Sequence, residues 1–133
     1  MRPVTYRNLR ELNFAYLAVT TAGTAVIDPD TDAMTTTGGV VHVGGTPYAA
    51  FFEAVSPSRA VVLIRVPRDP ATLTRVGGTQ TMTVSNWTVS GSARRTVASQ
   101  EPIEFSIGGT LNVNANQVEG TYVGTFTVDV QYQ

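Results

Sequence analysis

Apolar and polar residues alternate along several short segments of this chain. The clearest case lies near the C-terminal end, where large apolar side chains share one parity and mostly threonines occupy the other: Tyr122, Phe126, Val128, Val130 and Tyr132. Because successive side chains of a β-strand point to opposite faces, this pattern predicts a strand with one buried face. Its place near the end of the chain allows it to lie at a sheet edge, where unpaired backbone groups are open to a partner.

The same period of two recurs upstream. It runs through residues 103–113, where Gly108-Gly109 predicts a bulge or a sharp bend. The apolar run 60–64 predicts a central strand buried on both faces. In residues 79–89 the apolar parity switches, which predicts a bulge or a change of sheet near Asn86. Further strands are expected at 12–17, 24–27, 40–43 and 48–55.

Short strands at this spacing, separated by Gly and Pro, predict an antiparallel β-sandwich of about 7–9 strands. Composition agrees, because 20 Thr and 19 Val in 133 residues favour a pleated surface over a helix. The length fits one domain over residues 1–133, in which residues 1–10 form an extended N-terminal arm or a strand.

Charge and hydropathy exclude two classes of partner. The formal net charge is −1 and the nine basic residues, all Arg, are scattered, so the basic stripe of a nucleic-acid-binding protein is missing. Apolar runs of roughly four residues fall far short of the ~20 that a membrane-spanning helix needs. No leader peptide opens the sequence, so an exported protein would have to lose one that is not included here.

Candidate catalytic and metal-binding residues are few. His42 is the single histidine, and its place in an alternating run predicts a solvent-facing side chain rather than a catalytic base. Without Cys, a zinc site has too few nitrogen and sulfur ligands. Asp28, Asp30 and Asp32 are spaced like the start of a calcium loop, but Ala33 and Gly39 replace the Gly and Glu that such a loop needs. We therefore favour a hairpin turn in which Asp side chains cap backbone amides, with a weak calcium site as the alternative.

Aromatic side chains provide a third candidate. Trp87 and Tyr48 could form part of a flat platform for a sugar or a protein partner, because such rings bind with little loss of rotamer freedom. Packing in the core is the competing interpretation. An exposed Trp87 beside a second aromatic ring would favour sugar binding, and a buried one would not.

The closing segment, from Gly108-Gly109-Thr110-Leu111 through Asn116-Gln117 to Gly120-Thr121-Tyr122, resembles the bacterial family known as domain of unknown function 4402. Leu12-Asn13-Phe14 and Ile27-Asp28-Pro29 fit the same family, so the resemblance spans nearly the whole chain. It implies an exported, pilin-like protein with an immunoglobulin-like β-sandwich. Related fimbrial subunits are completed by a neighbour's N-terminal strand. Here Pro3 and the broken parity of Val4, Tyr6 and Leu9 make the N-terminal stretch a poor donor strand.

The expected function is therefore that of a non-enzymatic surface or fimbrial subunit, extracellular after transit through the periplasm, which acts through strand pairing. Its expected partners are proteins: copies of itself, other fibre subunits or a chaperone. A carbohydrate-binding module is the alternative. No cofactor is expected.

Overall fold

A computed structural model of the chain describes residues 4–132, and all the regular secondary structure in this range is β-strand. The strands are β1 (Thr5–Arg10), β2 (Tyr16–Ile27), β3 (Met34–Gly44), β4 (Ala50–Val55), β5 (Ala60–Arg65), β6 (Ala71–Arg75), β7 (Thr81–Val89), β8 (Arg94–Val97), β9 (Ile103–Val113), β10 (Tyr122–Val123) and β11 (Asp129–Tyr132).

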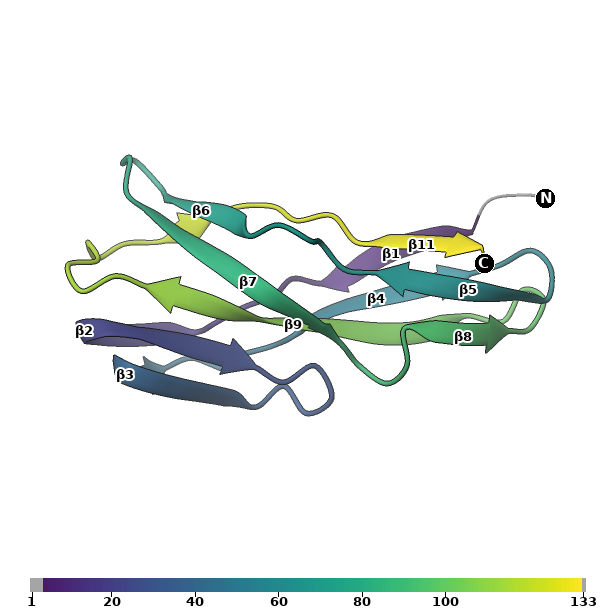
Figure 1. Ribbon diagram of the computed structural model, residues 1–133, viewed down its shortest axis with the longest axis horizontal. Helices are drawn as coiled ribbons and strands as arrows, with labels where there is room; N and C mark the ends of the chain where they lie inside the picture. The colour runs from purple at the N-terminus through teal and green to yellow at the C-terminus, as the bar shows by residue number, and fades with distance from the viewer. Residues whose placement is uncertain (1–3, 133) are drawn as a thin grey trace.

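The strands form two antiparallel sheets (Figure 1). Eight strands make the larger sheet, which follows the order β1-β4-β9-β7-β6-β10, carries β2 and β3 beside β9, and curls into a half-barrel. Three strands make the smaller sheet, in the order β11-β5-β8. The predicted all-β sandwich of antiparallel sheets is thus confirmed, with more strands than expected because β6 and β8 were not predicted and the predicted C-terminal strand is divided into β10 and β11.

Strand β9 organises the larger sheet. One of its margins pairs with β4 over 103–107 and then with β2 over 110–113, and the other margin pairs with β7. β9 runs through Gly108 and Gly109 as one strand, and the irregularity of the β7–β9 pair lies opposite them, between the pairs Ser85–Thr110 and Thr88–Gly108. Both are buried at the point where β9 changes partners. A Cβ on Gly108 would lie 2.1 Å from the carbonyl oxygen of Ile27, so glycine allows a close approach of two backbones.

The irregularity lies on the facing strand. The register between β7 and β9 shifts between Ser85 and Thr88, and Asn86 has a φ of 51°. Asn tolerates this left-handed conformation better than most residues because its short side chain bonds locally. The bulge predicted near Asn86 is confirmed.

The core consists of two hydrophobic clusters. The first lies between the two sheets and includes Phe52, Val62, Phe105 and Val130. The second lies against the part of the larger sheet that carries β2 and β3, and it includes Val84 and Leu111 among its buried members. Leu12 and Trp87 pack against both clusters, so they connect them.

Two predicted strands differ in detail. Strand β5 is central in its sheet, as expected, but only Val62 and Ile64 are fully buried, whereas Val61 and Leu63 on the other face are half-buried. The strand expected at 12–17 begins only at Tyr16. Asn13, upstream, forms an isolated bridge with Tyr48.

Candidate functional site

The C-terminal segment confirms the predicted parity but not the single strand. β10 pairs with β6 of the larger sheet, and β11 pairs with β5 of the smaller one, so residues 124–128 cross between sheets. Val128 and Val130 are buried. Phe126 lies against Trp87 with ring centroids 4.4 Å apart, and the Tyr132 hydroxyl lies 3.3 Å from Ser56 Oγ. Tyr122 is separate from this cluster, because its hydroxyl donates to the carbonyl of Val118 at 2.6 Å.

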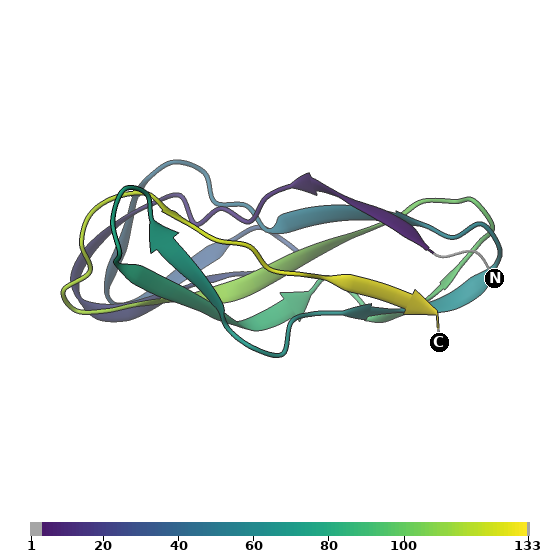
Figure 2. The same cartoon turned by 90° about the horizontal axis from the view of Figure 1, so that it is seen from above.

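One outer strand of each sheet lies near the ends of the chain. These strands are β1, an outer strand of the larger sheet, and β11, an outer strand of the smaller one (Figure 2). We call this pair of strands the β1–β11 margin. Each strand pairs with a single neighbour of its own sheet, β4 or β5, within the described residues. A side-chain bond joins them: the Tyr6 hydroxyl donates to Asp129 Oδ1 at 3.4 Å.

The surroundings of Tyr6 change its ionisation. Partial burial raises the pKa of Tyr6 above its ordinary value, and the charge and hydrogen bond of Asp129 raise it further. The neutral phenol, which donates to Asp129, is therefore the form that the fold favours.

The acidic turn has the predicted structural role. Asp28 Oδ1 accepts a bond from the amide of Asp30 at 2.8 Å, between β2 and β3. The other two carboxylates are directed elsewhere: Asp30 accepts from the amide of Gly91, and Asp32 accepts from Arg10 and from the amide of Ala49. Among the described residues, no three His, Asp or Glu side chains gather into a possible metal site.

His42 is exposed, as predicted, and its Nε2 lies 2.9 Å from the carbonyl oxygen of Gly44. The neighbouring Val41 and Val43, which should face the core by alternation, are instead 53% and 62% exposed. Strand β3 therefore presents apolar side chains to solvent.

Trp87 and Tyr48 have different partners. Trp87 is half-buried, packs on Phe126, and donates its Nε1 hydrogen to the carbonyl of Asp69 at 3.3 Å. Tyr48 lies under the guanidinium of Arg10, whose Cζ is 4.6 Å from the ring centroid. The structure therefore gives Trp87 a role in packing and Tyr48 a cation–π contact.

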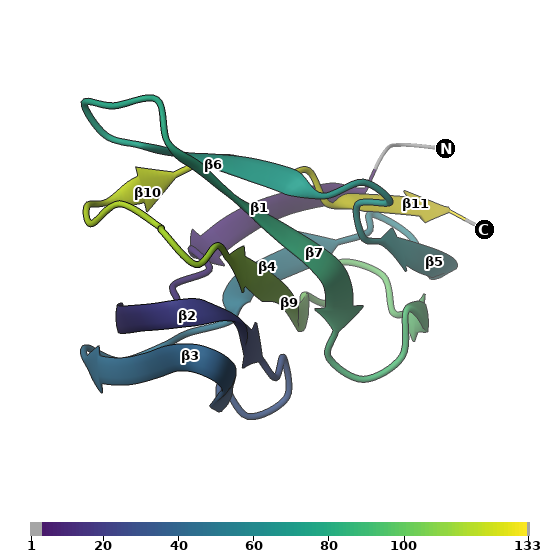
Figure 3. The same ribbon diagram turned by 60° about the vertical axis from the view of Figure 1, so that its left-hand side comes forward.

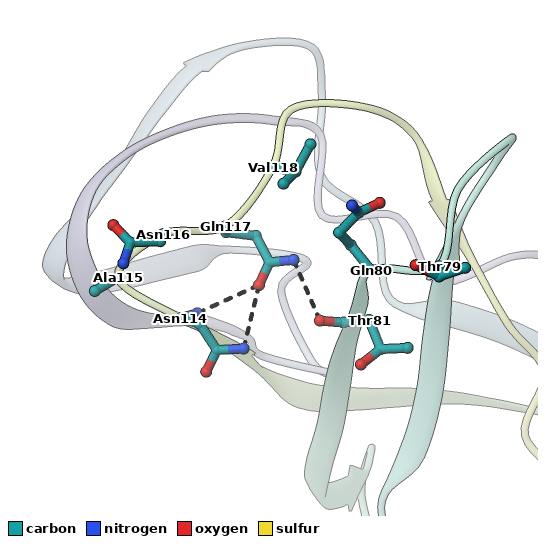
Figure 4. Close-up of a pocket in the computed structure, with 8 residues that line it drawn as sticks. All are labelled: Thr79, Gln80, Thr81, Asn114, Ala115, Asn116, Gln117 and Val118. Atoms are coloured by element: carbon teal, nitrogen blue, oxygen red, sulfur yellow. Dashed lines mark hydrogen bonds between the residues drawn. The ribbon is translucent and has the colours of Figure 1, made fainter.

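A polar hollow of about 410 Å³ lies at the end of the larger sheet (Figure 4). Amide and hydroxyl side chains dominate its lining: Thr79, Gln80, Thr81, Asn114, Ala115, Asn116, Gln117 and Val118. Gln117 holds it together, because its Nε2 donates to the carbonyl of Thr81 at 3.2 Å and to the Tyr122 hydroxyl at 2.8 Å. Its lining carries no charge. The sequence signalled this hollow only as a polar connection around Asn114–Gln117.

A family model described as a domain of unknown function, DUF4402, matches residues 4–132. The chain belongs to the DUF4402 family. Its model covers nearly the whole chain, which confirms the resemblance seen in the sequence. No curated protein and no solved structure matches this DUF4402 chain. Within the described residues, no helix is long and apolar enough to cross a membrane.

Proposed function

We propose that this DUF4402 domain is a non-enzymatic, exported surface or fimbrial subunit that acts through β-strand pairing. The β1–β11 margin is the observation that carries the proposal. It contains one outer strand of each sheet, and the Tyr6–Asp129 side-chain bond links the two strands. Among the described residues β1 pairs only with β4, so its other margin offers backbone donors and acceptors to an added strand, which is the usual basis of β-strand addition.

The chemistry of the surface supports a binding role over catalysis. The ring nitrogen of His42 lies close to backbone carbonyls, and the acidic side chains of the β2–β3 turn are engaged in structural bonds. The hollow around Gln117 is lined by uncharged side chains, without the base that covalent catalysis requires. The resemblance of the closing segment to the DUF4402 family, which implies an exported, pilin-like protein, supports export and assembly outside the cell.

A crosslink across the margin tests this proposal. Because the chain contains no Cys, the double variant Tyr6→Cys with Asp129→Cys can be closed selectively by a short bis-maleimide. We expect the unlinked variant to form assemblies larger than a dimer as its concentration rises in sedimentation velocity. The linked variant should not, because a strand can no longer enter.

The controls are the two single cysteine variants, each capped with a mono-maleimide. They carry the same chemical groups but leave the margin open, so they should assemble like the unlinked protein. Equal sedimentation of linked and unlinked protein over the whole concentration range would overturn the proposal.

The polar hollow supports a second candidate, binding of a neutral sugar. Uncharged amides and hydroxyls offer the donors and acceptors that sugar hydroxyl groups require, and Gln117 is already fixed by its bonds. On a glycan array, Asn116→Ala should lose binding while Trp87→Phe, which keeps an aromatic ring in the core, retains it. If only Trp87→Phe lost glycan binding, the sugar site would be the aromatic platform and not the polar hollow. An array with no bound glycan would remove this candidate.

A further inference from the structure

We infer that the free edge of β3 is a self-association surface, whose partner is the same edge of a second copy of this chain. The inference rests on the proposed function, because it names one edge and one partner for strand pairing. β3 pairs with β2 along one margin, and its other margin is the outer boundary of the larger sheet (Figure 3).

β3 differs from the other outer strands in its charged residues. Folded proteins usually protect an exposed edge with charged residues, Pro or a very short strand. β1 carries Arg7 and Arg10, β8 carries Arg94 and Arg95, and β11 has four residues that include Asp129. The 11 residues of β3 contain no acidic residue, no Arg and no Pro. Of the longer outer strands, β3 is therefore the one without charged residues or Pro.

The same property points to a second copy as the partner. When an edge pairs with itself about a two-fold axis, each residue meets a residue of the same strand. An edge that carries like charges repels its own copy, as β1 and β8 would. The uncharged β3 does not, and the net charge of −1 adds little repulsion between whole molecules. A strongly charged foreign strand would find no opposite charge on β3.

Exposed side chains agree with pairing at this edge. Val41 and Val43 are 53% and 62% exposed, and Tyr16, on the adjacent strand, is 70% exposed. At the other end of β3, Thr35 and Thr37 are exposed, and threonine pairs across strands are favourable. Thr37 already makes one such pair, because its hydroxyl lies 2.6 Å from that of Thr24 on β2. A second copy would continue this pattern and shield the valines.

A triple variant, Thr35→Lys with Thr37→Lys and Val41→Lys, tests the inference. Antiparallel registers centred on residue 36, 38 or 39 each place two of these lysines opposite each other. In sedimentation at neutral pH and low salt, we expect the wild-type protein to form a dimer. The triple Lys variant should dimerise more weakly, by about tenfold or more. A mixture with the matching triple Glu variant should recover the dimer as a heterodimer.

The matched control places the same three substitutions on β6 and its following turn: Thr72→Lys, Thr74→Lys and Val76→Lys. These positions are also exposed, but β6 pairs with β7 along one margin and with β10 at Thr74 and Arg75 along the other. The control should dimerise like the wild type, and circular dichroism should show that all variants are folded.

The two proposals fail separately. The margin crosslink leaves β3 free, so linked protein should stop at a dimer that the β3 lysines weaken. Linked protein could lose the larger assemblies and form no dimer, or its dimer could be unaffected by the β3 lysines. Either result would overturn the role of β3 and leave the role of the margin standing. A dimer governed by β3 together with unchanged larger assemblies in linked protein would overturn the role of the margin alone.

Discussion

At the scale of single residues, Gly108 illustrates how backbone packing fixes a residue type. Because Gly108 has no Cβ, β9 can lie against the carbonyl of Ile27 at the end of β2. We predict that Gly108→Ala lowers the free energy of unfolding by about 1–3 kcal/mol, since the added methyl forces the two backbones apart. Urea denaturation measures this change.

Gly44→Ala is the control, because a Cβ there meets only the ring of Tyr16, at 3.4 Å, and the φ of Gly44 is not in the left-handed region. It should change stability by less than about 0.5 kcal/mol. Equal effects of the two substitutions would contradict the close approach at Gly108.

Asp32 joins three parts of the chain. It accepts from Arg10 at the end of β1 and from the amide of Ala49, which is fully buried, before β4. We predict that Asp32→Ala costs about 1–3 kcal/mol, chiefly because the buried amide loses its acceptor. The ion pair itself contributes less, since both side chains are over a third exposed.

Asp30→Ala, in the same turn, removes a bond to an exposed amide and should cost less than Asp32→Ala in thermal unfolding. The interpretation is wrong if the two variants lose the same stability, because the turn rather than the contacts of Asp32 would then be responsible.

At the scale of strands, the alternation of apolar and polar residues predicted the features that depend only on local sequence. The parity of residues 122–132 and the bulge at Asn86 follow from side chains alone. The change of sheet between β10 and β11 does not, because both halves keep one parity while their partners, β6 and β5, are distant in sequence. β8 escaped notice since it is short and begins with two arginines. Its place is secured by Arg95, which donates to the carbonyls of Ser90 and Glu104.

The polar hollow and the exposed edge of β3 escaped prediction for a related reason. The hollow is formed by the β6–β7 turn and the connection after β9, which only the folded sheet brings together. Val41 and Val43 carry an apolar pattern that alternation assigns to the core. Their exposure depends on β3 being the last strand of its sheet, which the sequence does not reveal.

The bond between β1 and β11 has a predictable pH dependence. The pKa of Tyr6 is raised in the folded state, so its contribution to stability is complete below the unfolded value of about 10 and declines as pH rises through the folded value. We predict that the wild type loses more stability than Tyr6→Phe as the pH rises above about 10. Near neutral pH the two should differ little, because the bond is long and exposed.

Urea denaturation at several pH values, with ionisation of Tyr6 followed by absorbance, measures both curves. Tyr16→Phe is the control, since this ring is 70% exposed. Parallel curves for wild type and Tyr6→Phe above pH 10 would show that Asp129 does not influence Tyr6.

At the scale of the whole molecule, the two hydrophobic clusters should unfold together. β9 contributes Phe105 and Ile107 to the first cluster and Leu111 and Val113 to the second, and Trp87 packs against both. Neither cluster can lose β9 without exposing the other, so we predict a single cooperative transition in urea. Trp87 is the only tryptophan, so its fluorescence reports on the junction while far-UV circular dichroism reports on all strands.

Cavity variants sharpen this prediction. Leu111→Ala in the second cluster and Val62→Ala in the first should each destabilise the protein by roughly 1–5 kcal/mol, the leucine variant more than the valine one. Because the clusters share β9 and Trp87, each variant should shift the fluorescence and circular dichroism midpoints by the same amount. Suppose instead that Val62→Ala moved the circular dichroism transition and left the Trp87 transition in place. The clusters would then be separate folding units, and β9 would not couple the two sheets into one domain.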